Sequence, residues 1–205
     1  MRTIFLSVTL VVFTLFSACN HKTKKENSTK ELATASPEDH SSQVPTISIH
    51  EAAFNGNVSQ IKNHLAANTN PDSVNQDGQT PIMLAAFNGH TDVVKLLTEN
   101  GASVTRKDNK GLTPLHFAAS GPFPETVQYL LDNGASINAT DDIENFTPLM
   151  YAASEGNIEV VRILLKYGAD PNLKDVDGDN AEAFATQNNH PEIGKLLKTA
   201  PNNKN

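Results

Sequence analysis

The sequence predicts an all-α solenoid of about five helix-turn-helix units, on three observations. The string TPIMLAAFNGHTDVVKLLTENGASV at residues 80–104 returns in related form at residues 113–137 and 147–171. The steps between the copies are 33 and 34 residues, a period typical of stacked two-helix units. Each copy opens with Thr-Pro and carries a Gly after its last apolar run, which are residues that begin and end helices.

The first helix of each unit is expected to begin at the Pro. In the second copy Thr113 is placed to cap the helix, and Pro114 takes the first helical position, where its fixed φ fits and its missing N–H is no loss. Leu115, Ala118 and Ala119 then place apolar and small side chains on one face at helical spacing. The Ala pair lets a second helix approach closely.

The second helix of each unit carries the larger apolar residues. Val127, Leu130 and Leu131 are spaced i, i+3 and i+4, and Gly134 falls where a helix C-terminus favours a left-handed residue. Neither helix can bury its apolar stripe alone. Each unit is therefore stable only when stacked on a neighbour, and the core runs along the array.

The copies resemble the ankyrin repeat family, whose unit reads T-P-L-H-x-A-A, then Gly, an apolar V-x-x-L-L run and G-A-D. ISIHEAAFNGNVSQIKNHLAANTNP at residues 47–71 and NAEAFATQNNHPEIGKLL at residues 180–197 are worn copies in the same phase. The resemblance implies an ankyrin-repeat solenoid over residues 46–199 with β-turn fingers between units. Its repeats would lie at about 47–76, 77–109, 110–143, 144–176 and 177–199.

The first and last units are expected to act as caps, because one face of each meets water. Both carry polar residues where inner units have apolar residues, Thr-Pro or Gly. These residues are Asn63, His64, Asn68, Asn180, Glu182 and Gln187.

The N-terminal residues predict export and lipidation. Arg2 precedes an apolar run at residues 4–18, too short to span a bilayer comfortably and laid out like a secretory signal. Ser17-Ala18-Cys19 resembles the lipobox of bacterial lipoproteins, which implies that residues 1–18 are a signal peptide and that Cys19 is lipidated. Asn20 after the Cys favours the outer membrane, facing the periplasm, with a cell-surface orientation left open. A chance Cys at the end of an ordinary signal or of an uncleaved anchor is the alternative.

A polar segment separates Cys19 from the repeats. Residues 20–44 are rich in Ser, Thr, Lys and Glu and have almost no large apolar residue, so residues 19–45 are interpreted as a lipidated Cys and a disordered tether. Residues 200–205 would be a short tail. Cys19 is the only cysteine, which excludes an intramolecular disulfide.

The sequence predicts no catalytic residue, cofactor or metal site. His50 and His116 stand at the H of the repeat motif, where the resemblance implies that the imidazole ties neighbouring turns. The string DVDGD at residues 175–179 looks like a calcium loop, but an EF-hand needs Gly at its sixth position and Glu at its twelfth. Here Gly178 is fourth and Thr186 is twelfth.

The resemblance implies protein binding through the finger tips and the inner face of the first helices. The corresponding finger residues are Gln76, Asp77, Gln79, Asn109, Lys110, Leu112, Ile143, Glu144, Phe146, Val176, Asp177 and Asp179. The residues at the ends of the first helices are Phe54, Asn55, Phe87, Asn88, Ser120, Ser154 and Glu155.

Five of these candidates are large and apolar although the architecture places them near water. They are Phe54, Phe87, Leu112, Ile143 and Phe146. Exposed apolar side chains on a concave surface are candidates for partner anchors. The alternative is that each side chain packs onto its own turn.

Charge indicates the kind of partner. Residues 46–200 carry 19 Asp and Glu against 10 Lys and Arg, so nucleic acid would be repelled and a basic protein patch attracted. A plain solubilising surface is the alternative. The leading hypothesis is a monomeric, lipid-anchored module of the bacterial cell envelope that binds a protein. The second hypothesis is that the chain is an immunity or inhibitor protein that neutralises a toxin or an envelope enzyme.

Overall fold

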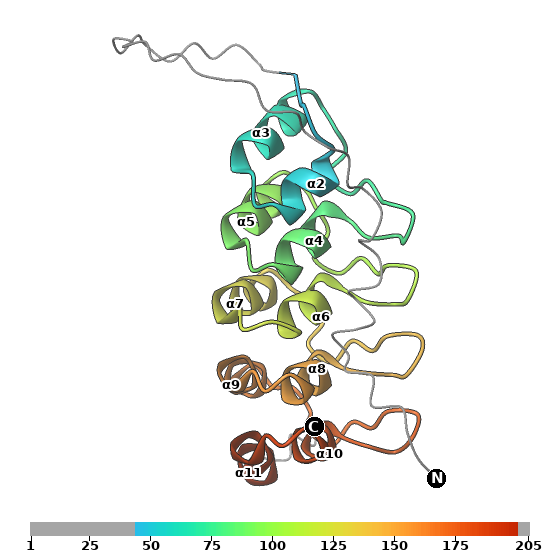
Figure 1. The fold of residues 1–205 in the computed structure, drawn as a ribbon, viewed down its shortest axis with the longest axis vertical. Coiled ribbons are helices and arrows are strands. Elements are labelled where there is room, and N and C mark those ends of the chain that lie inside the picture. The colour runs from blue at the N-terminus through green and yellow to red at the C-terminus, as the bar shows by residue number, and fades with distance from the viewer. Residues whose placement is uncertain (1–43, 201–205) are drawn as a thin grey trace, which may run out of the picture. The chain divides into compact units, whose positions relative to one another are not determined.

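The structure is a computed structural model that describes residues 44–200. Those residues form ten α-helices and no strand (Figure 1), which confirms the predicted all-α class. The helices are α2 (Ile49–Phe54), α3 (Val58–Ala66), α4 (Pro81–Phe87), α5 (Thr91–Glu99), α6 (Pro114–Ala119), α7 (Pro124–Asp132), α8 (Pro148–Ser154), α9 (Ile158–Lys166), α10 (Ala181–Gln187) and α11 (Pro191–Thr199). The predicted signal peptide, Cys19, and most of the tether and tail lie outside the described residues.

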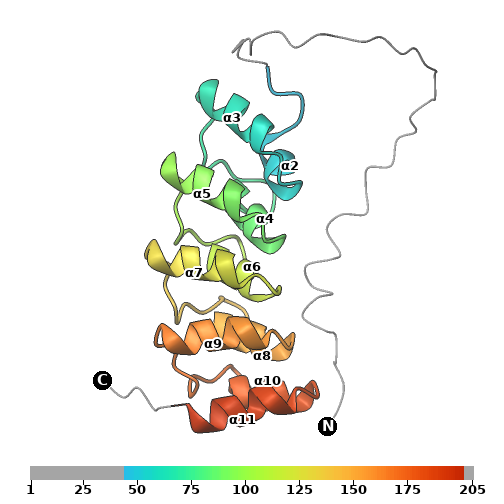
Figure 2. The same ribbon diagram turned by 90° about the vertical axis from the view of Figure 1, so that its left-hand side faces the viewer.

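The helices pair into five units that stack in two layers. The first helices, α2, α4, α6, α8 and α10, contact one another in chain order, and so do the second helices α3, α5, α7, α9 and α11. Figure 1 shows the two layers side by side, with the loops between units projecting beside the first helices, and Figure 2 shows the same stack with the second helices toward the viewer. The stacked repeat predicted from the 33-residue period is therefore confirmed.

Every first helix has a polar residue before it, even in the two worn units. Thr147 Oγ1 accepts a hydrogen bond from the Met150 N–H at 3.3 Å in the fourth unit. Ser48 and Asn180 replace Thr in the end units, where their side chains accept from N–H groups three residues on, at 3.1 and 3.0 Å. The end units thus lose the Thr-Pro motif and keep its capping function.

The core runs without a break along the stack. The Ala pairs of α2, α4, α6 and α8 are fully buried, as Ala118 and Ala119 are in α6. Val127 and Leu130 of α7 are also fully buried, while Leu131 is only partly so. Small residues on the first helices and larger ones on the second helices therefore fill the space between the layers, as the sequence predicted.

In the second, third and fifth units the turn between the helices packs on the preceding unit through an imidazole or aromatic ring, whereas in the fourth unit Asn157 Nδ2 donates to the Ala119 carbonyl oxygen at 3.3 Å. The His90 Nε2–H donates to the Phe54 carbonyl oxygen at 3.0 Å, and a Cβ added at Gly56 would lie 2.6 Å from His90 Nδ1. In the irregular third unit the Phe123 ring takes the corresponding place and covers Gly89. Phe123 therefore keeps the packing role of the turn, although Pro122 and Pro124 flank it in place of the Gly and Thr of the preceding unit.

One residue of the first cap differs from its prediction. His64 was expected to meet water, but its exposed fraction is 9%. Its Nε2 lies 2.7 Å from the Ile47 carbonyl oxygen and its Nδ1 lies 3.3 Å from Thr69 Oγ1. The prediction is wrong for His64 because the segment before α2 covers it. Asn68 is exposed, with a positive φ of 57°.

Candidate binding surface

Four hairpin loops, called fingers here, line one side of the stack. They are finger 1 (residues 75–79), finger 2 (108–112), finger 3 (141–146) and finger 4 (175–179), and a backbone hydrogen bond of 2.9–3.1 Å joins the first residue of each to the last. The first side chain also accepts two backbone N–H groups inside its loop. In finger 2, Asp108 Oδ1 accepts from Lys110 and Leu112 at 2.8 and 2.9 Å.

Backbone hydrogen bonds also join each finger to the next. The N–H of Asn109 donates to Asp77 O at 3.1 Å, and the N–H of Asp142 donates to Lys110 O at 2.9 Å. A third bond of 3.1 Å runs from the N–H of Val176 to the carbonyl oxygen of finger 3 at residue 144. The four fingers therefore form one row joined by hydrogen bonds rather than four independent loops.

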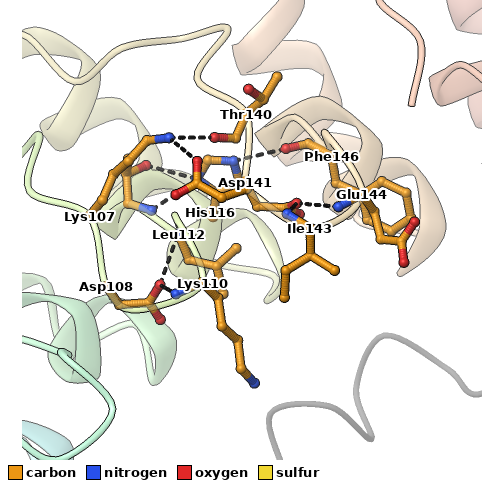
Figure 3. A network of polar contacts seen from close by, with 12 residues as sticks. Lys107, Asp108, Lys110, Leu112, His116, Thr140, Asp141, Ile143, Glu144 and Phe146 are labelled. Atoms are coloured by element: carbon orange, nitrogen blue, oxygen red, sulfur yellow. Dashed lines mark hydrogen bonds and ion pairs between the residues drawn. The ribbon is translucent and has the colours of Figure 1, made fainter. Parts of the chain in front are cut away.

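A side-chain pair reinforces the junction of fingers 2 and 3 (Figure 3). Lys107 Nζ donates to the Thr140 carbonyl oxygen at 2.9 Å and to Asp142 Oδ1 at 2.8 Å. The side chains of Lys107 and Asp142 are 44% and 63% exposed. Their attraction is therefore screened by water and adds order more than stability.

Asp141 holds finger 3 and is not a free acidic group. Its exposed fraction is 4%, and its Oδ1 accepts the N–H groups of Ile143 and Glu144 at 3.0 and 2.8 Å. The Tyr151 hydroxyl donates to Asp141 Oδ2 at 3.3 Å. Burial, and then the nearby Asp141 carboxylate, raise the pKa of Tyr151.

His116 links the third unit to finger 3. Its Nδ1 accepts the Thr113 N–H at 3.0 Å, so its Nε2–H donates to the Phe146 carbonyl oxygen at 3.1 Å (Figure 3). Burial lowers the pKa of His116 to about 4. In the first unit, the His50 Nε2–H donates to Ser73 O at 3.0 Å. Both imidazoles tie neighbouring turns, as predicted.

Of the five apolar candidates expected near water, only Ile143 is exposed, with an exposed fraction of 57%. Leu112 is buried, with 8% exposed, because it closes the finger 2 hairpin against the core. Phe54, Phe87 and Phe146 are half-buried. The expectation is therefore wrong for Leu112 and overstated for the three rings.

Contacts between rings explain the partial burial of two of these side chains. The Phe87 ring meets Phe117 edge to face at 6.4 Å between centroids. The Phe146 ring meets Tyr151 at 5.7 Å and Phe184 at 4.9 Å, both edge to face. The contacts of Phe87 with Phe117 and of Phe146 with Phe184 join neighbouring units, so packing between units, rather than onto each side chain's own turn, accounts for much of this partial burial.

The polar candidates divide by exposure. Gln76, Asn109, Glu144 and Asp177 are exposed. Asp77, Asn88, Lys110, Glu155 and Asp179 are half-buried. Gln79 is buried, and its Oε1 accepts from Asn75 Nδ2 at 3.0 Å; its role is to close finger 1.

Sequence reasoning missed the aromatic residues that follow the H of the repeat motif. Phe117, Tyr151 and Phe184 occupy that position in units three to five. Tyr151 and Phe184 are half-buried beside the fingers, and Phe117 is almost fully buried. Their recurrence at one phase of the repeat was the signal that could have revealed them.

Residues 44–200 contain no helix long and apolar enough to cross a membrane. In the same range no group of three or more His, Cys, Asp or Glu side chains could hold a metal ion. The arrangement that remains is a fixed row of loops with varied exposed side chains, which is suited to contact with another macromolecule.

Comparison with models of protein families gives a match over most of the chain. A sequence model of the family described as ankyrin repeats, in three copies, matches residues 49–141 and 139–205. A search of curated proteins finds no match.

Proposed function

The chain belongs to the ankyrin repeat family, whose domains are protein-protein interaction modules, and we propose that it binds its partner through the fingers and the inner face of the first helices. The family is typically a non-catalytic scaffold, and no reaction is assigned to this chain. The observation that carries the proposal is the row of fingers, which hydrogen bonds join and which has exposed, varied side chains such as Gln76, Asn109 and Glu144.

The fixed geometry of the fingers supports this choice of surface. Loops that are already ordered lose little conformational entropy on binding, so more of the contact energy appears as affinity. Each finger is held by its own hairpin bond, by two bonds to its first side chain and by a bond to its neighbour.

Charge supports a partner with a basic patch. The excess of 19 acidic over 10 basic residues in residues 46–200 favours such a partner and disfavours nucleic acid. This excess also suits the second candidate function, an immunity or inhibitor protein that neutralises a basic toxin or envelope enzyme. We propose that the chain acts as a monomer in either case.

The site of action proposed from the sequence is the cell envelope. The apolar run at residues 4–18 and the Ser17-Ala18-Cys19 string support export and lipidation at Cys19. The domain would be tethered to the outer membrane and face the periplasm. Labelling cells with radioactive palmitate tests this part: the parent should incorporate label and Cys19→Ser should not. An unlabelled parent would contradict the anchor without affecting the binding proposal.

A pull-down from detergent-solubilised envelope tests the binding proposal. The bait is the full chain, and the variant carries Gln76→Arg and Glu144→Arg on exposed finger positions. The matched control carries Ser59→Arg and Glu125→Arg, which are exposed on α3 and α7. We expect one protein to be retained by the parent and the control and lost by the finger variant. Retention by all three baits, or by none, would contradict the finger surface.

A further inference from the structure

Four large apolar side chains are markedly exposed in residues 44–200, and two of them lie on neighbouring fingers. The four are Val44, Val74, Ile143 and Val176. Ile143 on finger 3 is 57% exposed and Val176 on finger 4 is 56% exposed. The Val176 N–H bonds to the carbonyl oxygen of Glu144, the residue next to Ile143, at 3.1 Å, so the two side chains belong to one junction.

Carboxylate side chains inside both loops hold the backbone around Ile143 and Val176 in place. Asp141 Oδ1 accepts the Ile143 N–H at 3.0 Å in finger 3. Asp175 Oδ1 accepts the N–H groups of Asp177 and Asp179 at 3.0 and 2.7 Å in finger 4. Figure 3 shows the Ile143 side chain pointing away from His116 and the buried side of the loop. An apolar side chain fixed in this way meets a partner with little further loss of entropy.

One extra residue distinguishes finger 3 from the others. The loop runs from Asp141 to Phe146, one residue longer than the rest, and Asn145 takes a positive φ of 59° in it. Fingers 1 and 2 carry polar residues at their tips, Gln76 with Asp77 and Asn109 with Lys110. The exposed apolar pair is therefore confined to the junction of fingers 3 and 4.

The charges beside this pair are mainly negative. Glu144 and Asp177 are exposed and form no ion pair with another described residue. Asp142 shares its charge with Lys107. The nearest other cations along the chain are Lys110, on finger 2, and Lys174, just before finger 4. A partner that covers the pair therefore meets two unpaired carboxylates at its rim.

We propose that Ile143, Glu144, Val176 and Asp177, called the finger-tip patch, bind a protein segment in which a large apolar side chain is flanked by Lys or Arg. The apolar side chain would cover Ile143 and Val176, and the cations would approach Glu144 and Asp177. This proposal rests on the proposed function and names the chemistry of the partner. A lipid surface or a nucleic acid is disfavoured because anionic phosphates would face the two carboxylates.

Selection from a random peptide display library tests the proposal with a defined probe. The full chain is immobilised, and selected peptides are remade and titrated against purified chains. The patch variant carries Ile143→Asn and Val176→Asn, and the matched control carries Val74→Asn, a valine 48% exposed at finger 1. A second variant, Glu144→Gln with Asp177→Asn, is compared with Asp92→Asn and Glu125→Gln on the second helices.

We expect the enriched peptides to combine Lys or Arg with a large apolar residue. The apolar patch variant should raise their dissociation constant about tenfold or more, since a central apolar anchor commonly carries that share of an interface. The neutral variant should weaken binding in dilute salt and lose its effect as salt increases. Val74→Asn and the second-helix pair should leave binding unchanged.

Two outcomes would overturn the proposal. Peptides that lack cations, or that bind the patch variant as well as the parent, would show that the finger-tip patch is not the contact. If such peptides still lost affinity on Gln76→Arg or Asn109→Arg, the finger surface would stand and only this patch would fall. Enrichment of no peptide would contradict the patch, while the envelope pull-down would judge the proposed function separately.

Discussion

Replacing Asp141 by Ala should loosen finger 3 and the junction of the third and fourth units. The change removes the acceptor of the Ile143 and Glu144 N–H groups and of the Tyr151 hydroxyl. The two N–H groups lie in an exposed loop and regain water, so each costs about 0.5–1.5 kcal/mol. The half-buried Tyr151 hydroxyl costs about 1–3 kcal/mol when left without a partner. We expect a total loss of roughly 2–6 kcal/mol.

The chain itself supplies the control for this prediction. Asn75 stands at the same place in finger 1, where its Oδ1 accepts the N–H groups of Asp77 and Gln79 at 3.0 and 2.9 Å. An amide oxygen therefore suffices for the hairpin. Asp141→Asn should cost less than about 1 kcal/mol. Its Oδ1 can still accept the two backbone N–H groups, and its Nδ2 can donate to the Tyr151 hydroxyl oxygen.

Urea unfolding followed by circular dichroism measures both variants. With a slope of about 2–3 kcal/mol per molar urea, Asp141→Ala should lower the midpoint by roughly 1–2 M, and Asp141→Asn by much less. Hydrogen exchange of the Ile143 and Glu144 amides should accelerate in the Ala variant alone. An Ala variant as stable as the parent, or an Asn variant as damaged as the Ala variant, would refute the reasoning.

Three further predictions follow from the same contacts. Burial lowers the pKa of His116 from its ordinary 6.5 to about 4, so the unfolded chain binds a proton at a higher pH than the folded chain does. The free energy of unfolding should therefore drop by about 2 kcal/mol between about pH 7 and pH 5. His116→Gln should flatten this pH dependence in urea titrations. Gly89→Ala should destabilise the fold by about 2 kcal/mol more than Gly101→Ala. A Cβ at Gly89 would lie 2.1 Å from the Phe123 ring, whereas a Cβ at Gly101 would face open space. Equal melting temperatures of the two variants would contradict this prediction. Lys107→Met should cost less than about 1 kcal/mol in the same assay, because its pair with Asp142 is exposed.

The fold could be predicted from the sequence because one unit is written several times. Thr113, Pro114 and Gly134 mark the ends of helices in a single copy, and the repetition removes the ambiguity that each mark has alone. The end units lack Thr-Pro but keep Ser48 and Asn180, whose side chains cap helices equally well. The period of the repeat can therefore be recognised in the end units although their sequences have diverged.

The candidate surface was harder to predict because exposure depends on the neighbouring unit. Phe87 ends α4 and Phe146 closes finger 3, and rings from adjacent units cover part of each. Asp141 belongs to an acidic stretch in the sequence, but three hydrogen bonds fix it inside its loop. The ring contacts join residues of different units, so the pattern of a single unit does not show them.

The central claim is that a protein partner contacts the fingers. Photo-crosslinking tests it most directly, with a photoreactive amino acid placed at Asn109 on finger 2 and, in a separate chain, at Glu125 on α7, both exposed positions. Irradiated cells that produce the full chain should yield a protein adduct from position 109 and none from position 125. An adduct from position 125 alone, or the same adduct from both positions, would contradict the claim.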